Sequence, residues 1–237
     1  RGALTANTTG ARNTALGAYS LDANTDADDC TAVGRNALGA NTTAHDNTAV
    51  GANAMLANTT GAQNTAVGKN AMTVSTTSSD NSAFGFSAMG TGANSGSGRQ
   101  CAFGYAALQA VATGDTNNCF GFEAGRSLTS GSWNVAIGGE SLEENSGGSG
   151  NIAIGHDALR YYSGNYNVAI GFQSYSATSS TGANCVAVGY KSLAANTSGP
   201  DNTGVGYESL LIKQSKDLTS VDALILPGGE STAMKKI

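Results

Sequence analysis

Histidines and nucleophilic hydroxyls are the first residues to test for chemistry in this chain of 237 residues. The chain has two histidines, His45 and His156, which lie far apart in sequence and occupy unrelated positions of the repeat described below. Serine and threonine are abundant, but we find neither a Gly-x-Ser-x-Gly elbow nor a base paired with a nucleophile. We therefore expect no catalytic residues.

Four carboxylates lie close together near the N-terminus, at Asp22, Asp26, Asp28 and Asp29. Carboxylate oxygens are the ligands that Ca²⁺ prefers. This group occurs once, lacks the spacing of an EF-hand and matches no repeated calcium motif. The sequence therefore predicts no metal site, and it shows no motif for a cofactor.

Aromatic residues recur at a regular interval along the second half of the chain. A row of rings on a rod is able to contact the apolar faces of sugars, which makes these residues candidates for glycan contact. The alternative, which we favour, is that the rings stack on one another or cover an edge of the core. The candidates are Phe86, Tyr105, Phe122, Phe172, Tyr190 and Tyr207.

The element that must position these rings is a short repeat that ends in glycine. Asn-Thr-Ala-Val-Gly at 47–51 returns at 64–68, and close variants recur at a spacing of 17 residues, with departures of one or two residues in three places. This period is too short for helical repeats or propeller blades. It predicts an all-β parallel β-solenoid of about twelve coils, or laps. The marker glycines are Gly17, Gly34, Gly51, Gly68, Gly85, Gly104, Gly121, Gly138, Gly155, Gly171, Gly189 and Gly206.

Two apolar columns indicate how one lap is built. The residue before the marker glycine is apolar in every lap, and a second column, mostly Leu and Met, follows four residues after the glycine. We expect two strands per lap, with these columns facing each other across a thin core. Gly125 interrupts the second column, and we expect Leu128 to substitute there. The marker glycine itself suits a corner with positive φ or a close backbone approach.

The other columns are polar or small. Asn recurs four residues before the glycine and should stack amide on amide. Small residues two before and three after the glycine should let the backbone pack closely, across the lap or against a neighbouring chain. A threonine column shares the side of the apolar residue before the glycine, so we expect it to face inward, which argues against an ice-binding array. Its first members are Thr14, Thr31, Thr48 and Thr65.

The four cysteines do not fit a disulfide framework. Cys30 and Cys185 occupy the Asn column nine laps apart, roughly 43 Å at about 4.8 Å per lap. Cys101 and Cys119 lie on adjacent laps, but alternation along a strand should point them to opposite faces. We predict four free thiols, as in a protein folded in a reducing compartment.

Composition and organisation narrow the function further. Charged residues make up 12% of the chain and the net charge is −5, so no basic patch for nucleic acid is present. No apolar run is long enough to insert into a membrane. We assign residues 1–212 to the solenoid and 213–237 to a tail without the marker pattern. Because residues 1–4 match the middle of a lap, we expect a fragment of a longer protein.

The repeat at 47–61 resembles repeats of phage tail fibres and related surface proteins. More distantly, 134–138, 151–155 and 167–171 resemble the head repeats of trimeric autotransporter adhesins, although the period of 17 is longer than in that family. The resemblance covers about residues 1–212. It implies a left-handed β-roll, three chains side by side and a role in attachment.

The tail carries a second resemblance. Residues 222–232, Asp-Ala-Leu-Ile-Leu-Pro-Gly-Gly-Glu-Ser-Thr, are similar to the strand and glycine loop of the glutaminase subunit of pyridoxal phosphate synthase. In that family the loop helps hold glutamine beside a cysteine nucleophile further along the chain. Here no cysteine follows Cys185 and no histidine follows His156, so we expect no glutaminase activity. We read the tail as a cap over the last lap or as a foreign end.

The sequence as a whole predicts a structural or attachment protein and not an enzyme. We expect a section of a viral, phage-type tail or surface fibre on the virion or another extracellular surface. The expected assembly is a parallel homotrimer that binds a glycan or protein receptor of the host. The alternatives are a cell-surface trimeric adhesin head and an ice-binding solenoid.

Overall fold

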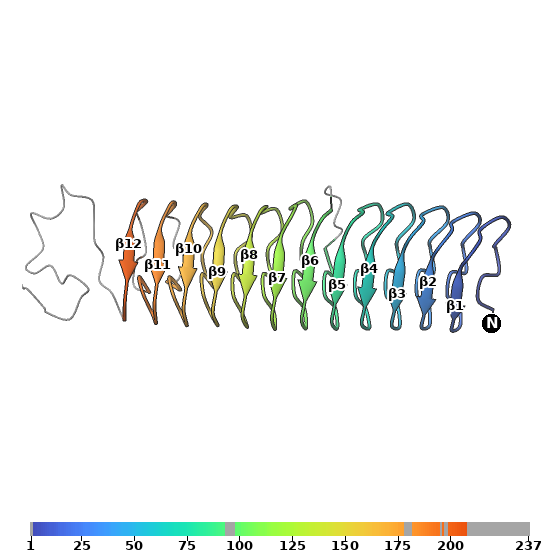
Figure 1. Cartoon of the computed structure of the whole chain (residues 1–237), viewed down its shortest axis with the longest axis horizontal. Helices are drawn as coiled ribbons and strands as arrows, with labels where there is room; N and C mark the ends of the chain where they lie inside the picture. Colours follow the sequence, from blue (N-terminus) through green and yellow to red (C-terminus); the bar gives the residue numbers. More distant parts are fainter. Residues whose placement is uncertain (1, 93–97, 178–181, 195, 197–198, 208–237) are drawn as a thin grey trace, which may run out of the picture.

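The chain folds into a parallel β-solenoid, a rod with one strand per lap (Figure 1). The computed structural model describes residues 2–207 except 93–97, 178–181, 195 and 197–198. Twelve strands form a single sheet in chain order, and each pairs in parallel with the next. The strands are β1 (Thr14–Leu16), β2 (Thr31–Val33), β3 (Thr48–Val50), β4 (Thr65–Val67), β5 (Ser82–Phe84), β6 (Cys101–Phe103), β7 (Asn118–Phe120), β8 (Val135–Ile137), β9 (Ile152–Ile154), β10 (Val168–Ile170), β11 (Val186–Val188) and β12 (Thr203–Val205).

The register of the sheet follows the repeat. Thr31 pairs with Thr48 and Val33 pairs with Val50, and equivalent columns pair in all the other laps as well. At about 4.8 Å per lap, β1 and β12 lie about 53 Å apart. The predicted parallel solenoid with coils of about 17 residues is therefore confirmed. In the part of the chain that the structure describes, there is no helix with the length and apolar character to cross a membrane.

The prediction of two strands per lap is wrong. Each lap holds one strand of three residues, and the second apolar column lies in a turn. Asn53 and Met55, two and four residues after the marker glycine, both have positive φ, 59° and 51°. Met55 N–H still donates to Ala71 O on the next lap, at 2.9 Å, so the backbone donor is satisfied. Leu and Met rarely adopt positive φ, and an apolar column therefore does not reveal such a turn.

The inward column of the strand also differs from the prediction. In β3, Ala49 is fully buried, whereas Thr48 and Val50 on either side of it are only half-buried. Because side chains alternate along a strand, the residue before the marker glycine points outward, together with the threonine column. The core consists of the Ala column of the strands packed against the Leu and Met column of the turns. The turn lies too close to the sheet for a larger strand residue.

Both small columns lie inside the rod. The Ala column of the strands is buried, and so is the Ala or Ser column three residues after the glycine, as at Ala54 and Ser141. These columns let the two sides of one lap approach each other. Of the two expected roles of these columns, close packing across the lap is therefore the one that the structure shows, and packing against a neighbouring chain is not.

In the lap that lacks the second apolar residue, a residue of the strand fills the space. At Gly125, which has a φ of 61°, an added Cβ would lie 2.7 Å from Cys119 Sγ. Cys119 is larger than the usual Ala and fills the space that Leu or Met fills elsewhere. Leu128, the expected substitute, is fully buried but lies three residues further along the turn.

The predicted asparagine ladder is present and buried. Asn47 Oδ1 accepts from Asn64 N at 3.0 Å and from Asn64 Nδ2 at 3.2 Å, and Asn64 Oδ1 accepts from Asn81 N at 3.0 Å. Gln100 continues the ladder in its lap, with its backbone N–H donating to Asn81 Oδ1. Cys185 N donates to Asn167 Oδ1 at 2.9 Å, so the cysteines in this column sit within the ladder.

Replacing Asn134 with Ala should lower the free energy of unfolding by about 2 kcal/mol. The change leaves the buried N–H of Asn151 without its acceptor at 2.9 Å and Gly148 O without a donor. Thermal unfolding followed by circular dichroism measures the loss. Thr60→Ala, at an exposed turn position, is the control and should unfold like the wild type. An equal melting temperature for Asn134→Ala would show that the ladder contributes little.

Candidate interaction surface

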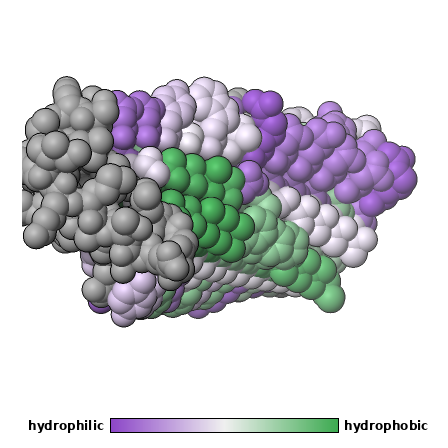
Figure 2. Space-filling model, turned by 60° about the vertical axis from the view of Figure 1, so that its left-hand side comes forward, coloured by the Kyte–Doolittle hydropathy of each residue, from purple (hydrophilic) through white to green (hydrophobic). Residues whose placement is uncertain are grey.

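The exposed large apolar side chains of the described residues belong to the strand of each lap and to the residues that border it. They come from four columns: the two outward strand columns, one and three residues before the marker glycine, and the bordering columns five before and one after it. We call this surface the strand strip, and Figure 2 shows hydrophobic residues gathered in a band along the rod. The exposed residues are Leu16, Phe86, Phe103, Tyr105, Phe120, Phe122, Trp133, Ile137, Ile152, Tyr166, Ile170, Phe172, Tyr190, Val205 and Tyr207.

The centre of the strand strip carries no charge. The two outward strand columns contain no Asp, Glu, Lys or Arg in any of the twelve laps. From β8 to β11 the strands read Val-Ala-Ile, Ile-Ala-Ile, Val-Ala-Ile and Val-Ala-Val. Continuous apolar runs of this kind are typical of parallel strands with both faces covered, whereas here one face is open. A contiguous exposed apolar surface that extends over many laps marks an interaction site.

The six candidate aromatic residues form two stacked runs on one border of the strip. Phe86, Tyr105 and Phe122 stack with centroid distances of 5.4 and 5.2 Å. Their ring planes lie within 9° of parallel, so each ring covers the face of the next. The second run joins Phe172, Tyr190 and Tyr207 in the same way. This is the stacking that we favoured from the sequence, and contact between sugars and these six residues stays a prediction.

A further aromatic run lies on the strand itself. Phe84, Phe103 and Phe120 stack with centroid distances of 4.4 and 5.1 Å. We missed it as a surface feature because its column was assigned to the core. The sequence contained a signal for this run. Alternation points the two residues that flank the central alanine of a strand to the same side, away from the side of the alanine.

The bordering aromatic ladder is interrupted at one lap. Gly139 occupies the ladder position between Phe122 and His156. His156 stacks on Phe172 at 5.7 Å, so it belongs to the second run. It also contacts Asp157 Oδ2 through Nδ1 at 3.0 Å. The structure thus gives this histidine two partners, Phe172 and Asp157.

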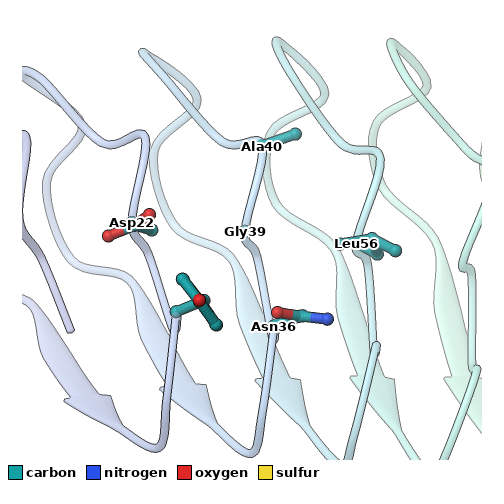
Figure 3. A pocket seen from close by; sticks show the side chains of 6 residues that line it. Asp22, Asn36, Gly39, Ala40 and Leu56 are labelled. Carbon is teal, nitrogen blue, oxygen red and sulfur yellow. The ribbon is translucent and has the colours of Figure 1, made fainter. Parts of the chain in front are cut away.

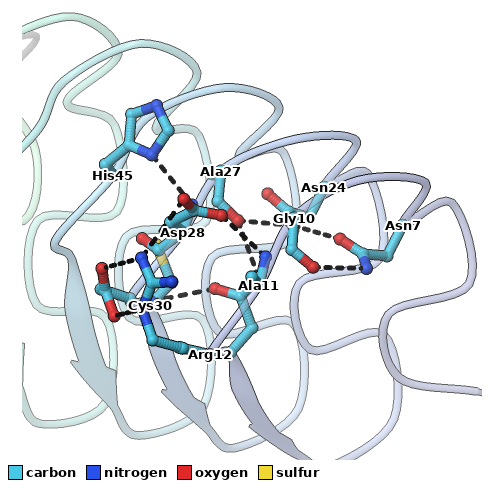
Figure 4. A network of polar contacts seen from close by, with 11 residues as sticks. Asn7, Gly10, Ala11, Arg12, Asn24, Ala27, Asp28, Cys30 and His45 are labelled. Atoms are coloured by element: carbon cyan, nitrogen blue, oxygen red, sulfur yellow. Dashed lines mark hydrogen bonds and ion pairs between the residues drawn. The ribbon is translucent and has the colours of Figure 1, made fainter.

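The N-terminal carboxylates are held by protein donors (Figure 4). Arg12 contacts Asp29 at 2.6 Å and Asp28 at 3.3 Å, and Asp28 N donates to His45 Nδ1 at 2.9 Å. The hydrogen bond from Arg12 lowers the pKa of Asp29. Asp22 accepts a hydrogen bond from Thr5. Within the described ranges, no group of three or more His, Cys, Asp or Glu side chains is placed to hold a metal ion.

An ion-pair network that the sequence analysis missed crosses three laps outside the strip. Arg160 Nε lies 2.8 Å from Glu143 Oε2, and Arg126 reaches Glu143 Oε1 at 3.4 Å and Glu123 at 3.3 Å. Burial acts to lower the pKa of Arg160, but the charges of Glu143 and then Glu140 raise it overall. Arg126, Glu143 and Arg160 are each 17 residues apart, so the repeat period was the available signal. The network ties neighbouring laps together.

A shallow groove opens near the N-terminus (Figure 3). It has a volume of about 330 Å³ and lies where Gly39 stands between Asp22 and Leu56, which carry side chains on the flanking laps. Tyr19, Asn36 and Ala40 complete the lining. These residues bring together neither a nucleophile with a base nor a set of metal ligands.

All four cysteines are free thiols, as predicted. Cys119 is fully buried, and burial raises its pKa, so it stays protonated and unreactive in the folded chain. Cys101 is half-buried on the strand strip, on the opposite face to Cys119, as alternation predicted.

Comparison with known proteins finds similarity at the C-terminus. Residues 201–237 match the model of the SNO glutamine amidotransferase family. The pyridoxal 5'-phosphate synthase subunit PdxT of Methanocaldococcus jannaschii is 56% identical over 32 residues, which are 14% of this chain and 17% of that protein. No solved structure matches the chain.

This similarity confirms the resemblance of the tail and corrects one prediction. The expectation that the chain is not an enzyme is contradicted, because its C-terminal segment resembles an enzyme family. The matched segment begins within the last described lap and continues through 213–237, the tail predicted from the sequence, which lies outside the described residues.

Proposed function

We propose that the solenoid is a section of an attachment fibre, such as a phage-type tail or surface fibre, on the virion or another extracellular surface. The observation that carries the proposal is the register of the sheet: twelve laps pair column on column without a break. Cross-lap hydrogen bonds and buried ladders run through the laps, which makes a stiff rod. The resemblance of the repeats to fibre repeats supports the same function.

We propose further that three copies assemble in parallel around the strand strips. One rod has a thin core of Ala, Leu and Met and an open apolar sheet face. A strip about 53 Å long and roughly 15 Å wide offers about 800 Å², the area that one partner contributes to a standard interface. Because the centre of the strip is uncharged, identical copies meet there without repulsion.

Parallel packing suits the order of residue types along the strip. The outward column three residues before the marker glycine is threonine from β1 to β4 and Val or Ile from β8 to β11. In parallel register, like residues meet at the same height. In antiparallel register, threonine hydroxyls would face Val and Ile and lose hydrogen bonding to water.

Native mass spectrometry at micromolar protein concentration tests this assembly. We expect three times the mass of one chain. A folded monomer under those conditions would contradict the assembly and weaken the proposal of a fibre. Binding of the assembled rod to host-surface glycans or proteins is then measured with that species.

A second candidate function follows from the N-terminal laps. Thr14, Thr31, Thr48 and Thr65 face outward and are exposed or half-buried, contrary to the expectation that they face inward. A regular outward threonine array is compatible with ice binding. Thermal hysteresis of the purified protein tests this directly. Measurable hysteresis would favour an open strip over an assembled one, because assembly covers the threonines.

A further inference from the structure

We propose that Trp133 of one chain inserts beside Gly139 of a neighbouring copy and completes the aromatic ladder there. The proposal rests on the parallel assembly described above and deepens it by naming the contact. Trp133 is the chain's one tryptophan, and its side chain is 63% exposed. Gly139 is the position at which the ladder lacks a ring.

Symmetry brings these two residues to one height. Trp133 lies five residues before Gly138 and Gly139 lies one residue after it, so they occupy opposite borders of the strip in the same lap. A rotation axis parallel to the rod preserves height along the rod. In any such assembly, the border of one copy that carries Trp133 meets the border of the next copy that carries Gly139.

The contact has to form between chains. Trp133 and Gly139 flank the ends of β8, up to about 20 Å apart within one chain. On the ladder side, Phe122 and His156 are two laps apart, about 9.6 Å. Ring centroids within the runs are 5.2 Å apart for Tyr105 and Phe122 and 5.7 Å for His156 and Phe172. The interval is thus close to twice the ring spacing. His156 lies against it, with its Cδ2 3.1 Å from the position of a Cβ on Gly139, so an inserted ring has to displace the imidazole.

The charges of the two borders agree with this pairing. In the lap of Gly34, the borders carry Asp29 and Arg35, which have opposite charges. In the lap of Gly104, they carry Arg99 and Tyr105, a cation and an aromatic ring. From β1 to β12, the sequence places no two like charges on the borders of one lap.

Tryptophan fluorescence tests the contact, because one residue gives the whole signal. In the threefold-mass species we expect a blue-shifted emission maximum that moves to the red when dilution separates the chains. Gly139→Phe supplies the missing ring within each chain and should displace the indole. We expect red-shifted emission from a species that still has three times the mass of one chain. Gly139 is not at a positive φ, and the nearest atom to an added Cβ is His156 Cδ2, at 3.1 Å on a side chain that is able to shift.

Cross-linking provides a second, independent readout. In a Cys101→Ser background, Trp133→Cys combined with Gly139→Cys should give covalent trimers with a bifunctional maleimide shorter than the separation within one chain. Each single variant is the control and should stay uncross-linked.

The outcomes separate the contact from the assembly. Threefold mass with unshifted emission in Gly139→Phe would overturn the Trp133 contact and leave the fibre proposal standing. Threefold mass with no cross-links in the double variant would overturn both the contact and the parallel packing around the strips. A monomer by native mass would overturn both.

Discussion

Replacing Ala153 with Asp should unfold the laps around β9, whereas replacing its neighbour Ile154 with Asp should leave them folded and break the assembly. Ala153 is fully buried between the sheet and the turn column, so a carboxylate there is buried without a partner and also overpacks the core. We expect a loss of roughly 4 kcal/mol or more in the free energy of unfolding. Ile154 points outward into the strand strip, half-buried.

Circular dichroism melting and native mass, measured together, distinguish the two effects. Ala153→Asp should lower the melting temperature strongly. Ile154→Asp should retain the solenoid spectrum but give the mass of one chain, because three carboxylates would meet at one height in the assembly. Thr60→Asp, in an exposed turn, is the control for both readouts. A larger loss of stability for Ile154→Asp than for Ala153→Asp would show that we have assigned the wrong strand column to the core.

Replacing Gly68 with Ala should have the second large effect, a loss of several kcal/mol in the free energy of unfolding. Gly68 has a φ of 134°, a conformation that residues with a side chain rarely adopt. An added Cβ would lie 2.3 Å from Gly85 O on the next lap. That backbone has little freedom to move away, because Gly85 N donates to Val67 O at 2.8 Å.

Gly147→Ala is the matched control for this change. Gly147 is exposed in a turn, and the nearest atom to an added Cβ there is Ser130 Oγ at 3.4 Å, an ordinary contact. Melting temperatures of the two variants should differ by many degrees. Equal melting temperatures would show that the glycine column is not required for the corner.

The sequence predicted the solenoid, its register and its ladders because each depends on a column that repeats with the lap. Asn47, Asn64 and Asn81 stack as expected since the period alone places them one above another. The inside and outside of the strand were assigned wrongly because alternation fixes only that Ala49 and Val50 point to opposite sides. Which side is the core depends on how close the turn lies, and Met55 lies close only because its backbone is left-handed.

The candidate surface was predicted in part. The aromatic column was found, and its rings stack as we favoured, because Tyr105 and Phe122 recur at the lap period. The Phe84 column was not recognised as part of the surface, since its position depends on the same inside–outside assignment. The ion pairs of Arg160 and Glu143 depend on side chains that are near only after the chain has wound one lap.

A distance between two copies of the same strip residue tests the central claim, parallel assembly through the strand strip, most directly. Thr31 lies on the strip in β2, and Thr31→Cys in a Cys101→Ser background carries one outward spin label. Pulsed electron paramagnetic resonance should give a label-to-label distance below about 20 Å, because parallel strips bring the labels to one height. A distance of roughly 43 Å or more, nine laps of about 4.8 Å, would indicate antiparallel packing, and the absence of dipolar coupling would indicate single rods. Either result would contradict the account.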